Sequence, residues 1–481
     1  MRIDLLIDGA SQGAADGKTF ERRTPDGGAI ATVAAAAGDD DVARACAAAA
    51  RAFPAWAKLG PNARRAALNK AAELLEARED RFAELMAREI GATRGWAAFN
   101  VRLGAGILRE AAAMTTQIGG EVIPSDKPGT LALATRVPAG VCLGIAPWNA
   151  PVILGVRALA MPLACGNCVI LKASEICPGT HRLIGETLHD AGLSAGVVNV
   201  LTNAPADAAA VVGALIAHPA VRRINFTGST GVGRAIAEVA ARHLKPALLE
   251  LGGKAPLVVL ADADLDAAVD AAAFGAFMNQ GQICMSTERI VVDEAVADAF
   301  VVKLAAKARG LHAAAPGTAG AALGSLVSTE AAARVRALID DAATAGATVF
   351  GNGNDDGAIM QPTVIDRVTP AMRLYAEESF GPVVTVVRGD GDAALIALAN
   401  DSEFGLSAAV FSRDVSRAMA VAAEIRSGIC HINGPTVHDE AQMPFGGVKD
   451  SGYGRFGGKA AIAEFTDLRW ITIETEQHYP F

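Results

Sequence analysis

The chain has 481 residues, a net charge of −9 at neutral pH and 51% hydrophobic residues. Its length exceeds what one hydrophobic core usually covers, so we expect two or three domains. Charged residues interrupt every apolar run before it reaches membrane-spanning length, and the acidic balance argues against a nucleic-acid-binding surface. We therefore expect a soluble protein with neither a membrane nor nucleic acid as a partner.

The cysteines and the N-terminus indicate the cellular compartment. The seven cysteines are odd in number and irregularly spaced, which favours reduced thiols over a disulfide framework. Asp4 and Asp8 interrupt the N-terminal apolar stretch, whereas a secretory signal has an uninterrupted core. We therefore expect a cytoplasmic protein. The eight histidines lack metal-ligand spacing, so no metal site is predicted.

The first third of the chain changes from helices to an alternating pattern. Residues 39–118 form an alanine-rich helical region in which Asp39, Asp40 and Asp41 can cap the first helix and Pro61 opens another. From about residue 132, short apolar runs alternate with helical stretches, which is typical of a parallel α/β sheet. The predicted strands are 141–146, 168–172, 197–201 and 223–226, with helices at 180–191 and 206–217.

The same alternation starts again after Gly252 and Gly253, which indicates a second α/β domain. Helix and strand patterns continue over 330–425, and 444–458 is a glycine-dense loop. The closing run 468–473 alternates, so we expect it to pair with another strand as an arm. The first predicted elements of this domain are a strand at 256–260, a helix at 264–278 and a strand at 288–292.

Cys284 is the strongest candidate for a nucleophile. It follows a predicted helix and lies among the small and polar residues of 281–286 rather than within an apolar stripe. A thiolate adds readily to a carbonyl when a lowered pKa or a nearby base makes it available. Taken alone, the segment also fits a structural thiol, because free cysteines are usually core residues.

Glu250 and Asn149 each follow or end a predicted strand. Glu250 lies beside Gly252 and Gly253 at the apparent domain junction, where a carboxylate could activate water. The amide of Asn149 could donate a hydrogen bond to a developing oxyanion. The alternatives are a solvated turn for Glu250 and a simple turn for Asn149.

Two segments suggest a dinucleotide. The turn 227–233 follows a predicted strand, contains three glycines and leads into a helix predicted to begin near Arg234, whose first amides would face a pyrophosphate. A simple tight turn fits that segment equally well. Lys172 and Glu175 lie at the end of the strand 168–172, where they could hold a ribose or form a surface ion pair.

Seven motifs together resemble the aldehyde dehydrogenase superfamily, and their order and spacing match over nearly the whole chain. The motifs are 147–149, 172–175, 226–229, 250–254, 281–284, 378–382 and 444–447. The resemblance implies an α/β fold in three parts and a homodimer or homotetramer. These parts are a Rossmann-like NAD-binding domain (1–119 and 140–249), an α/β catalytic domain (250–445) and a small β oligomerisation element (120–139 and 459–481).

The resemblance also implies roles for site residues and an NAD(P) cofactor. Cys284 matches the family nucleophile, Glu250 the general base, and Asn149 the side-chain half of an oxyanion hole completed by the Cys284 backbone amide. Glu175 would accept a ribose 2'-hydroxyl but repel a 2'-phosphate, which favours NAD over NADP. One departure is the stretch 203–207, which replaces a glycine-rich turn of many relatives. The implied cofactor contacts are Trp148, Lys172, Ser174, Glu175, Gly228, Ser229, Gly233, Leu251, Glu378 and Phe380.

The substrate is indicated by two further stretches. Residues 431–445 and the chain end 477–481 resemble bacterial aromatic aldehyde dehydrogenases of the vanillin, salicylaldehyde and benzaldehyde types. We expect an apolar slot for a ring, with Arg157 near its polar end; the alternative role of Trp96 and Phe99 is packing. The expected lining is Trp96, Phe99, Arg157, Ile283, Met285 and Phe445. A semialdehyde or aliphatic aldehyde dehydrogenase and a cysteine thioester hydrolase remain alternatives.

Overall fold

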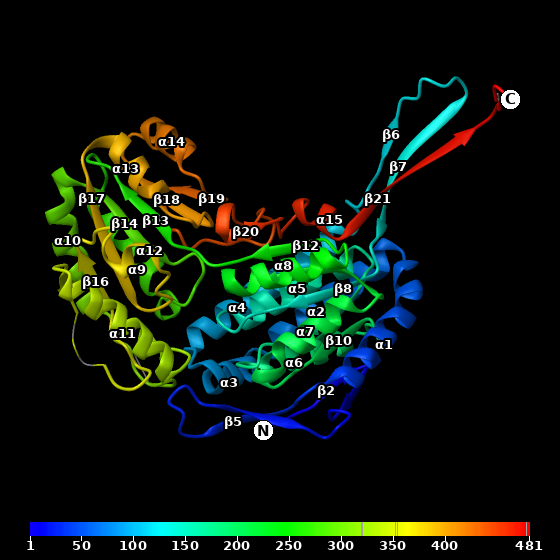
Figure 1. The fold of residues 1–481 in the computed structure, drawn as a ribbon, viewed down its shortest axis with the longest axis horizontal. Helices are drawn as coiled ribbons and strands as arrows, with labels where there is room; N and C mark the ends of the chain where they lie inside the picture. The colour runs from blue at the N-terminus through cyan, green and yellow to red at the C-terminus, as the bar shows by residue number, and fades with distance from the viewer. Residues whose placement is uncertain (319–320, 352, 354, 478) are drawn as a thin grey trace.

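The computed structural model describes residues 1–318, 321–351, 353, 355–477 and 479–481. His478, within the stretch 477–481 noted above, therefore lies outside the described residues. Figure 1 shows two α/β lobes side by side and a narrow arm that projects from the first lobe. The α/β fold class predicted from the sequence is confirmed.

The first lobe is built on an eight-stranded sheet of order β20-β12-β11-β8-β9-β10-β2-β3. The five strands from β12 to β10 in this order are parallel. At the edges, β20 pairs antiparallel with β12, β2 with β10, and β3 with β2. Among the parallel strands, β8, β9 and β10 are buried on both faces and largely apolar, which is why they were predictable. The strands are β2 (Leu5–Ile7), β3 (Ala10–Gln12), β8 (Val141–Ile145), β9 (Cys168–Lys172), β10 (Val198–Leu201), β11 (Val221–Thr227), β12 (Ala247–Glu250) and β20 (Gly452–Tyr453).

Helices cover both faces of this sheet. They are α1 (Asp39–Ala57), α2 (Pro61–Ala77), α3 (Glu79–Ile90), α4 (Arg94–Met114), α5 (Pro151–Ala164), α6 (Pro178–Asp190), α7 (Ala208–Ala217) and α8 (Thr230–Arg242). The prediction that the last of these begins near Arg234 was wrong. Ser229 is the extended N-cap of α8, and the Gly233 amide already donates to the Ser229 carbonyl over 2.9 Å. Gly231 and Gly233 are thus inside the first turn, and only Gly228 lies before the helix.

A three-stranded sheet near the N-terminus was not predicted. It has the order β1-β5-β4, with β1 (Arg2–Ile3), β5 (Ile30–Ala35) and β4 (Thr19–Arg23). Ile3, Phe20 and Ala34 form a small hydrophobic cluster within it. This sheet places Arg22 beside the end of α3 and Val327.

The second lobe has a seven-stranded sheet of order β15-β16-β17-β14-β13-β18-β19, parallel except at β15. Its strands are β13 (Ala255–Val259), β14 (Thr287–Asp293), β15 (Thr348–Phe350), β16 (Thr363–Asp366), β17 (Val383–Gly389), β18 (Ser407–Phe411) and β19 (Ile429–Ile432). Its helices are α9 (Leu265–Phe277), α10 (Glu294–Arg309), α11 (Thr329–Thr344), α12 (Arg373–Ala376), α13 (Gly391–Asn400) and α14 (Val415–Glu424). The predicted strands and helix between 256 and 292 are confirmed.

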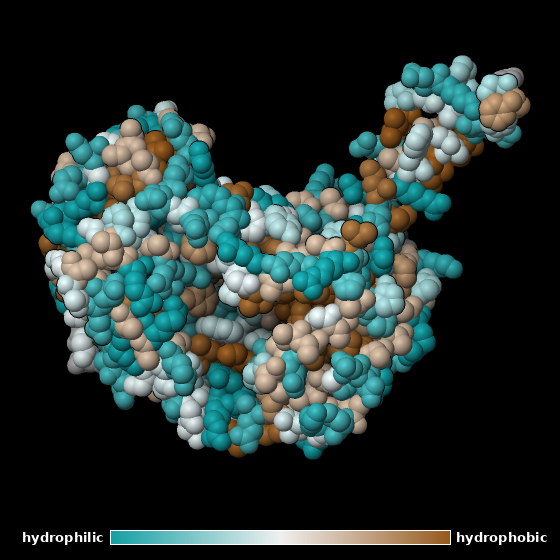
Figure 2. Space-filling view, in the orientation of Figure 1, coloured by the Kyte–Doolittle hydropathy of each residue, from teal (hydrophilic) through white to brown (hydrophobic). Residues whose placement is uncertain are grey.

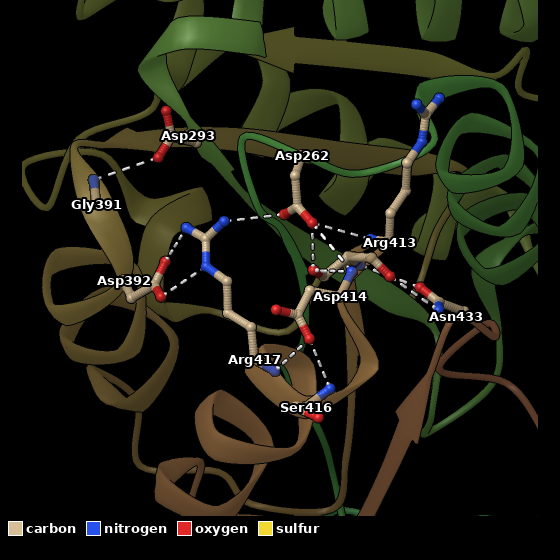
Figure 3. Close-up of polar contacts among 10 residues, drawn as sticks. Asp262, Asp293, Gly391, Asp392, Arg413, Asp414, Ser416, Arg417 and Asn433 are labelled. Carbon is tan, nitrogen blue, oxygen red and sulfur yellow. Dashed lines mark hydrogen bonds and ion pairs between the residues drawn. The ribbon is translucent and has the colours of Figure 1, made fainter.

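Polar side chains close the carboxyl edge of this second sheet (Figure 3). The Arg417 guanidinium donates to Asp262 over 2.9 Å and to Asp392 over 2.5 Å. Asp262 also accepts from the backbone amides of Arg413 and Asp414, each over 3.1 Å. Ligands of open α/β sheets usually bind at this edge, but here ion pairs and backbone contacts fill it.

The arm consists of β6 (Glu121–Ile123), β7 (Thr130–Pro138) and β21 (Thr466–Glu474). The predicted closing strand is β21, which pairs antiparallel with β7 along its whole length. Just before it, α15 (Ala460–Glu464) and Phe465 pack into the core of the first lobe. Leu468 and Trp470 on β21 are 64% and 76% exposed. Within the described ranges, no helix has both the length and the apolar character needed to cross a bilayer.

Candidate active site

The candidate residues meet where the two sheets face each other. Glu250 ends β12 and Asn149 follows β8, so both lie at the carboxyl edge of the first sheet. Cys284 precedes β14 and Gly253 precedes β13, at the amino edge of the second sheet. A Cβ on Gly253 would lie 2.2 Å from the Cys284 carbonyl oxygen, so only glycine allows this approach.

The backbone before Cys284 has an unusual conformation. Asn279, Gln280 and Gly281 all have positive φ, at 49°, 56° and 71°. Left-handed conformations are costly for residues with a Cβ, and three in succession persist only where surrounding contacts hold them. A Cβ on Gly281 would lie 2.0 Å from the carbonyl oxygen of Gly381, so this position requires glycine. We call residues 279–284 the nucleophile loop.

Two glutamine side chains fasten the nucleophile loop to the segment 324–327. The Gln280 amide accepts from the Gly324 N–H over 2.8 Å and donates to the Ser325 carbonyl over 2.9 Å. The Gln282 side-chain oxygen accepts from the Val327 N–H over 2.9 Å. Because these amides are buried and satisfied, they fix the loop in one conformation.

Asn149 is oriented by three contacts. Its side-chain amide donates to the Gln282 carbonyl over 3.0 Å, while its own carbonyl accepts from the Trp96 indole over 3.0 Å and the Asn279 amide over 3.1 Å. Within the described part of the chain, Gln282 is the acceptor for Nδ2, which leaves its second N–H for a ligand. The amide is therefore preorganised beside the nucleophile loop.

Glu250 and Cys284 form a coupled pair. Glu250 is 1% exposed, and in the described structure neither of its carboxyl oxygens has a hydrogen-bond partner. Burial raises the pKa of Glu250 to about 7, although the Cys284 thiol and the Arg157 charge act against this shift. Burial and the neighbouring Glu250 raise the pKa of the partly buried Cys284 thiol well above its usual range. The resting thiol is therefore protonated, with a nearby carboxyl able to take its proton.

A buried ion pair supports the backbone of residues 379–380. Lys254 and Glu288 lie 2.8 Å apart, with side chains 0% and 4% exposed. Glu288 also accepts from the Ser379 amide, the Ser379 hydroxyl and the Phe380 amide, each over 2.9 Å. These contacts satisfy the buried carboxylate and fix the backbone of 379–380. Neither Lys254 nor Glu288 was predicted as a site residue, although a glutamate near the start of an apolar strand was a usable signal.

Glu378 and Phe380 contact Gly253 and Trp148, respectively. Glu378 accepts from the Gly253 N–H over 2.9 Å, and burial raises the pKa of its carboxyl to about 7. Phe380 has a φ of 49° and packs edge-on against Trp148, with ring centroids 5.7 Å apart. Of these two predicted cofactor contacts, Phe380 thus adjoins Trp148 and Glu378 adjoins Gly253, next to the catalytic candidates.

A cavity of about 630 Å³ opens between β8, β9, α7 and α8. Figure 2 shows hydrophobic side chains gathered around the hollow between the lobes. Lys172 is ion-paired with Glu175, which also accepts from the Asn203 amide over 2.9 Å. Gly233 does not line the cavity and packs against Leu251 instead. A Cβ on Gly233 would lie 2.4 Å from the Leu251 side chain. The cofactor candidates that line the cavity are Trp148, Lys172, Ser174, Glu175 and Gly228.

The departure at 203–207 forms one wall of this cavity. Pro205–Asp207 is a short 3-10 helix, and Pro205 and Ala206 line the space. In the described chain the Asn203 side-chain oxygen is buried without a hydrogen-bond partner. Where many relatives have a glycine-rich turn, this chain thus has a mostly apolar wall. Among the described residues, the Asn203 side-chain oxygen is its one unsatisfied acceptor and lies beside Glu175.

A second cavity, of about 400 Å³, adjoins Cys284 and Asn149. The Trp96 and Phe99 rings stack with centroids 5.5 Å apart. Phe274 and Met278, which were not predicted, extend the apolar wall. All six residues predicted for the ring slot line it: Trp96, Phe99, Arg157, Ile283, Met285 and Phe445.

Arg157 is not an isolated cation in this cavity. It is 2.5 Å from Asp439, and the two side chains are 6% and 8% exposed. Its guanidinium also lies 4.4 Å from the centroid of the Phe445 ring. Asp439 was not predicted, and its partner is 282 positions away in the sequence. The charge available to an anionic substrate is therefore largely neutralised.

The fold and the site together define a class of α/β enzyme. Two largely parallel sheets face one crevice, where the Cys284 thiol and the Glu250 carboxyl lie close together, and a cavity of about 630 Å³ lies in the first lobe. Residues 13–471 match the model of the aldehyde dehydrogenase family, and the chain belongs to that family, whose members use NAD(P). The described residues contain no cluster able to hold a metal ion.

Relatives extend over the whole chain. A vanillin dehydrogenase from Pseudomonas fluorescens is 64% identical, and the match covers 99% of each chain. The crystal structure of a salicylaldehyde dehydrogenase from Pseudomonas putida G7, complexed with salicylaldehyde, is 49% identical with a TM-score of 0.98 and complete coverage of both chains. An NADP-dependent enzyme from E. coli is 34% identical with a TM-score of 0.95 and 98% coverage of each chain.

Proposed function

We propose that this enzyme oxidises benzaldehyde-type aromatic aldehydes to carboxylic acids with Cys284 as nucleophile. The observation that carries the proposal is the apolar, aromatic-lined cavity that adjoins both Cys284 and Asn149. The high identity to vanillin and salicylaldehyde dehydrogenases supports the same substrate class. The neutralised Arg157 gives an anionic semialdehyde tail little to bind.

Cys284, Asn149 and Glu250 have separate roles in the proposed reaction. The Cys284 thiolate adds to the aldehyde carbon, and the Asn149 amide with the Cys284 backbone N–H stabilises the resulting oxyanion. NAD(P), when bound, would supply the hydride acceptor, and loss of the hydride would bring the former aldehyde carbon to the oxidation level of the acid. The acyl group then remains on Cys284 as a thioester, and Glu250 removes a proton from the water that hydrolyses it.

The larger cavity fits NAD(P), and we propose that NAD is preferred. The start of α8 lines it without a side-chain cap, so the amides of this helix N-terminus suit a pyrophosphate. Lys172 and Glu175 offer a donor and an acceptor for ribose hydroxyls. A 2'-phosphate would meet the Glu175 carboxylate, which raises the cost of binding NADP.

The parts of the chain have separate tasks in this proposal. Segments 1–119 and 140–249 bind the cofactor, 250–445 carries the nucleophile, and 120–139 with 459–481 joins copies of the chain into a dimer or tetramer. Trp470, exposed on the arm, supports this use. We place the enzyme in the cytoplasm, where its seven free cysteines would stay reduced.

The test is NADH formation by the purified protein with benzaldehyde, vanillin, salicylaldehyde, succinic semialdehyde and hexanal, for wild type and Cys284→Ala. We expect the ring aldehydes to have the highest kcat/KM and Cys284→Ala to be inactive. Faster turnover of the aliphatic members would keep the mechanism and refute the aromatic preference. Thioester cleavage without any NAD-dependent turnover would instead indicate a hydrolase.

A further inference from the structure

The segment 324–327 forms the junction between the nucleophile loop and the first lobe. Gln280 and Gln282 hold it from the catalytic side, as described above. From the other side, a Cβ on Gly324 would lie only 2.4 Å from the Gly91 carbonyl oxygen at the end of α3. The two lobes thus meet here by direct backbone contact.

Arg22, on β4, completes this junction. Its Nη2 donates to the Val327 carbonyl over 2.9 Å and to the Glu89 carbonyl over 2.6 Å. Its Nε donates to the same Glu89 carbonyl over 2.9 Å. A planar guanidinium is suited to bridging two fixed carbonyls, which a lysine ammonium holds less rigidly.

Glu89, whose carbonyl accepts from Arg22, also contacts the start of α6 through its side chain. The Glu89 carboxylate is fully buried and accepts from the Gly179 N–H over 2.8 Å and from the Thr180 N–H and hydroxyl over 3.0 and 2.7 Å. These groups begin α6, which follows directly after the stretch containing Glu175. One guanidinium therefore links the start of α6 with the peptide that holds Gln282.

We propose that Arg22 is a positioning residue for the nucleophile loop, acting through Val327 and Gln282. The Gln282 carbonyl orients the Asn149 amide, so a displacement of this loop disturbs the thiol and the oxyanion donor together. The proposal rests on the role of Cys284 given above. Neither Arg22 nor Val327 lines the ring cavity. Loss of Arg22 therefore lowers kcat and leaves the KM for the aldehyde nearly unchanged.

The test compares Arg22→Met with Arg23→Met. Arg23 is the next residue, has a side chain 52% exposed and pairs with Glu21 at the surface. We expect Arg22→Met to lower kcat about tenfold or more, because small displacements of reacting groups are costly. Alkylation of Cys284 by iodoacetamide should slow as well, whereas Arg23→Met should match wild type. A lower melting temperature with unchanged kcat and alkylation would overturn the proposal.

Gln282→Met and the double variant test the route of the effect. If Arg22 acts through Gln282, the double variant should be no slower than the slower single variant. Independent effects would multiply, to about a hundredfold for two tenfold losses, and would refute the route. If Arg22→Met does not fold, Arg22→Lys takes its place, because lysine keeps the positive charge without the planar guanidinium. We expect the same fall in kcat in Arg22→Lys. A wild-type kcat in that variant would refute the need for the guanidinium. Cys284→Ala distinguishes a failure of the Arg22 proposal from a failure of the proposed function. Turnover in Cys284→Ala would refute the role of Cys284 itself.

Discussion

Glu250, which is buried, and Glu378, which is partly buried, are carboxyls of the same site with different surroundings. Burial raises the pKa of each to about 7. Glu378 accepts from the Gly253 amide and is held in place. Glu250 has no hydrogen-bond partner in the described structure. A carboxyl without a fixed partner can turn toward the thiol or toward a water molecule, which suits a base that serves two steps.

The pKa of Glu250 predicts the pH dependence of turnover. Below about 7 this carboxyl is protonated and cannot accept a proton, so the rate of thioester hydrolysis should rise as the pH increases through about 7. In Glu250→Gln, steady-state turnover should fall at least about a hundredfold, consistent with the loss of a general base. Pre-steady-state kinetics should show slower NADH formation in the first turnover, because Glu250 also takes the thiol proton, and a steady phase without this rise. Steady turnover equal to wild type would refute the assignment.

The charge of Glu175 should set the cofactor preference. Glu175→Gln removes the repulsion of a 2'-phosphate but keeps a hydrogen-bonding side chain, so the ratio of kcat/KM for NADP to that for NAD should rise about tenfold. Glu186→Gln on α6 is the control, because Glu186 is partly exposed and does not line the cavity. An unchanged ratio in Glu175→Gln would show that another group excludes NADP.

Sequence reasoning found residues of recognisable chemical type and missed their distant partners. Cys284, Asn149 and the ring-cavity residues were singled out, and the structure brings them together. Asp439 was missed because its role depends on Arg157, which lies 282 positions away. Arg22 was missed because nothing local marks a surface-strand arginine as a bridge to a residue 305 positions away. Such pairs follow from topology, which local patterns do not encode.

At the scale of elements, burial decided what could be predicted. β8 and β9 are buried on both faces, so their apolar runs were clear in the sequence. β1 has two residues and β4 alternates buried and exposed side chains over five, which is too little pattern to identify. The left-handed stretch 279–281 was also beyond prediction, since hydrogen bonds between the Gln280 side chain and the backbone of Gly324 and Ser325 hold it.

Gly281→Ala tests how far the site depends on that stretch. The added Cβ would meet the Gly381 carbonyl oxygen at 2.0 Å in addition to the strain of a φ of 71°. Gly17→Ala is a matched control, because Gly17 has a φ of 74° with nothing within 4 Å of a Cβ. We expect a loss of about 1–2 kcal/mol in Gly17→Ala and about 3 kcal/mol or more in Gly281→Ala. Thermal unfolding and kcat measure both effects; equal melting temperatures and full activity would contradict the predicted clash.

At the scale of the molecule, the two sheets use opposite edges. The first sheet presents its carboxyl edge to the crevice, with Glu250 and Asn149, while the second presents its amino edge, with Cys284. The carboxyl edge of the second sheet is occupied by the Arg417 network of Figure 3. The crevice between the lobes therefore combines the edge of one sheet, which we propose binds the cofactor, with the proposed nucleophile Cys284 from the other.

The exposed face of the arm predicts how copies of the chain assemble. Leu468 and Trp470 lie two residues apart on β21, so they share one face of the strand, and both are largely exposed. Replacing both with Asp should prevent burial of this face and shift the mass measured by light scattering after size-exclusion chromatography to that of the 49.1 kDa monomer. Val302→Asp on α10 is the control, since Val302 is 68% exposed and distant from the arm in the fold. Because the crevice lies within one chain, the monomer should still alkylate at Cys284. An unchanged mass in the double variant would show that assembly uses a different surface.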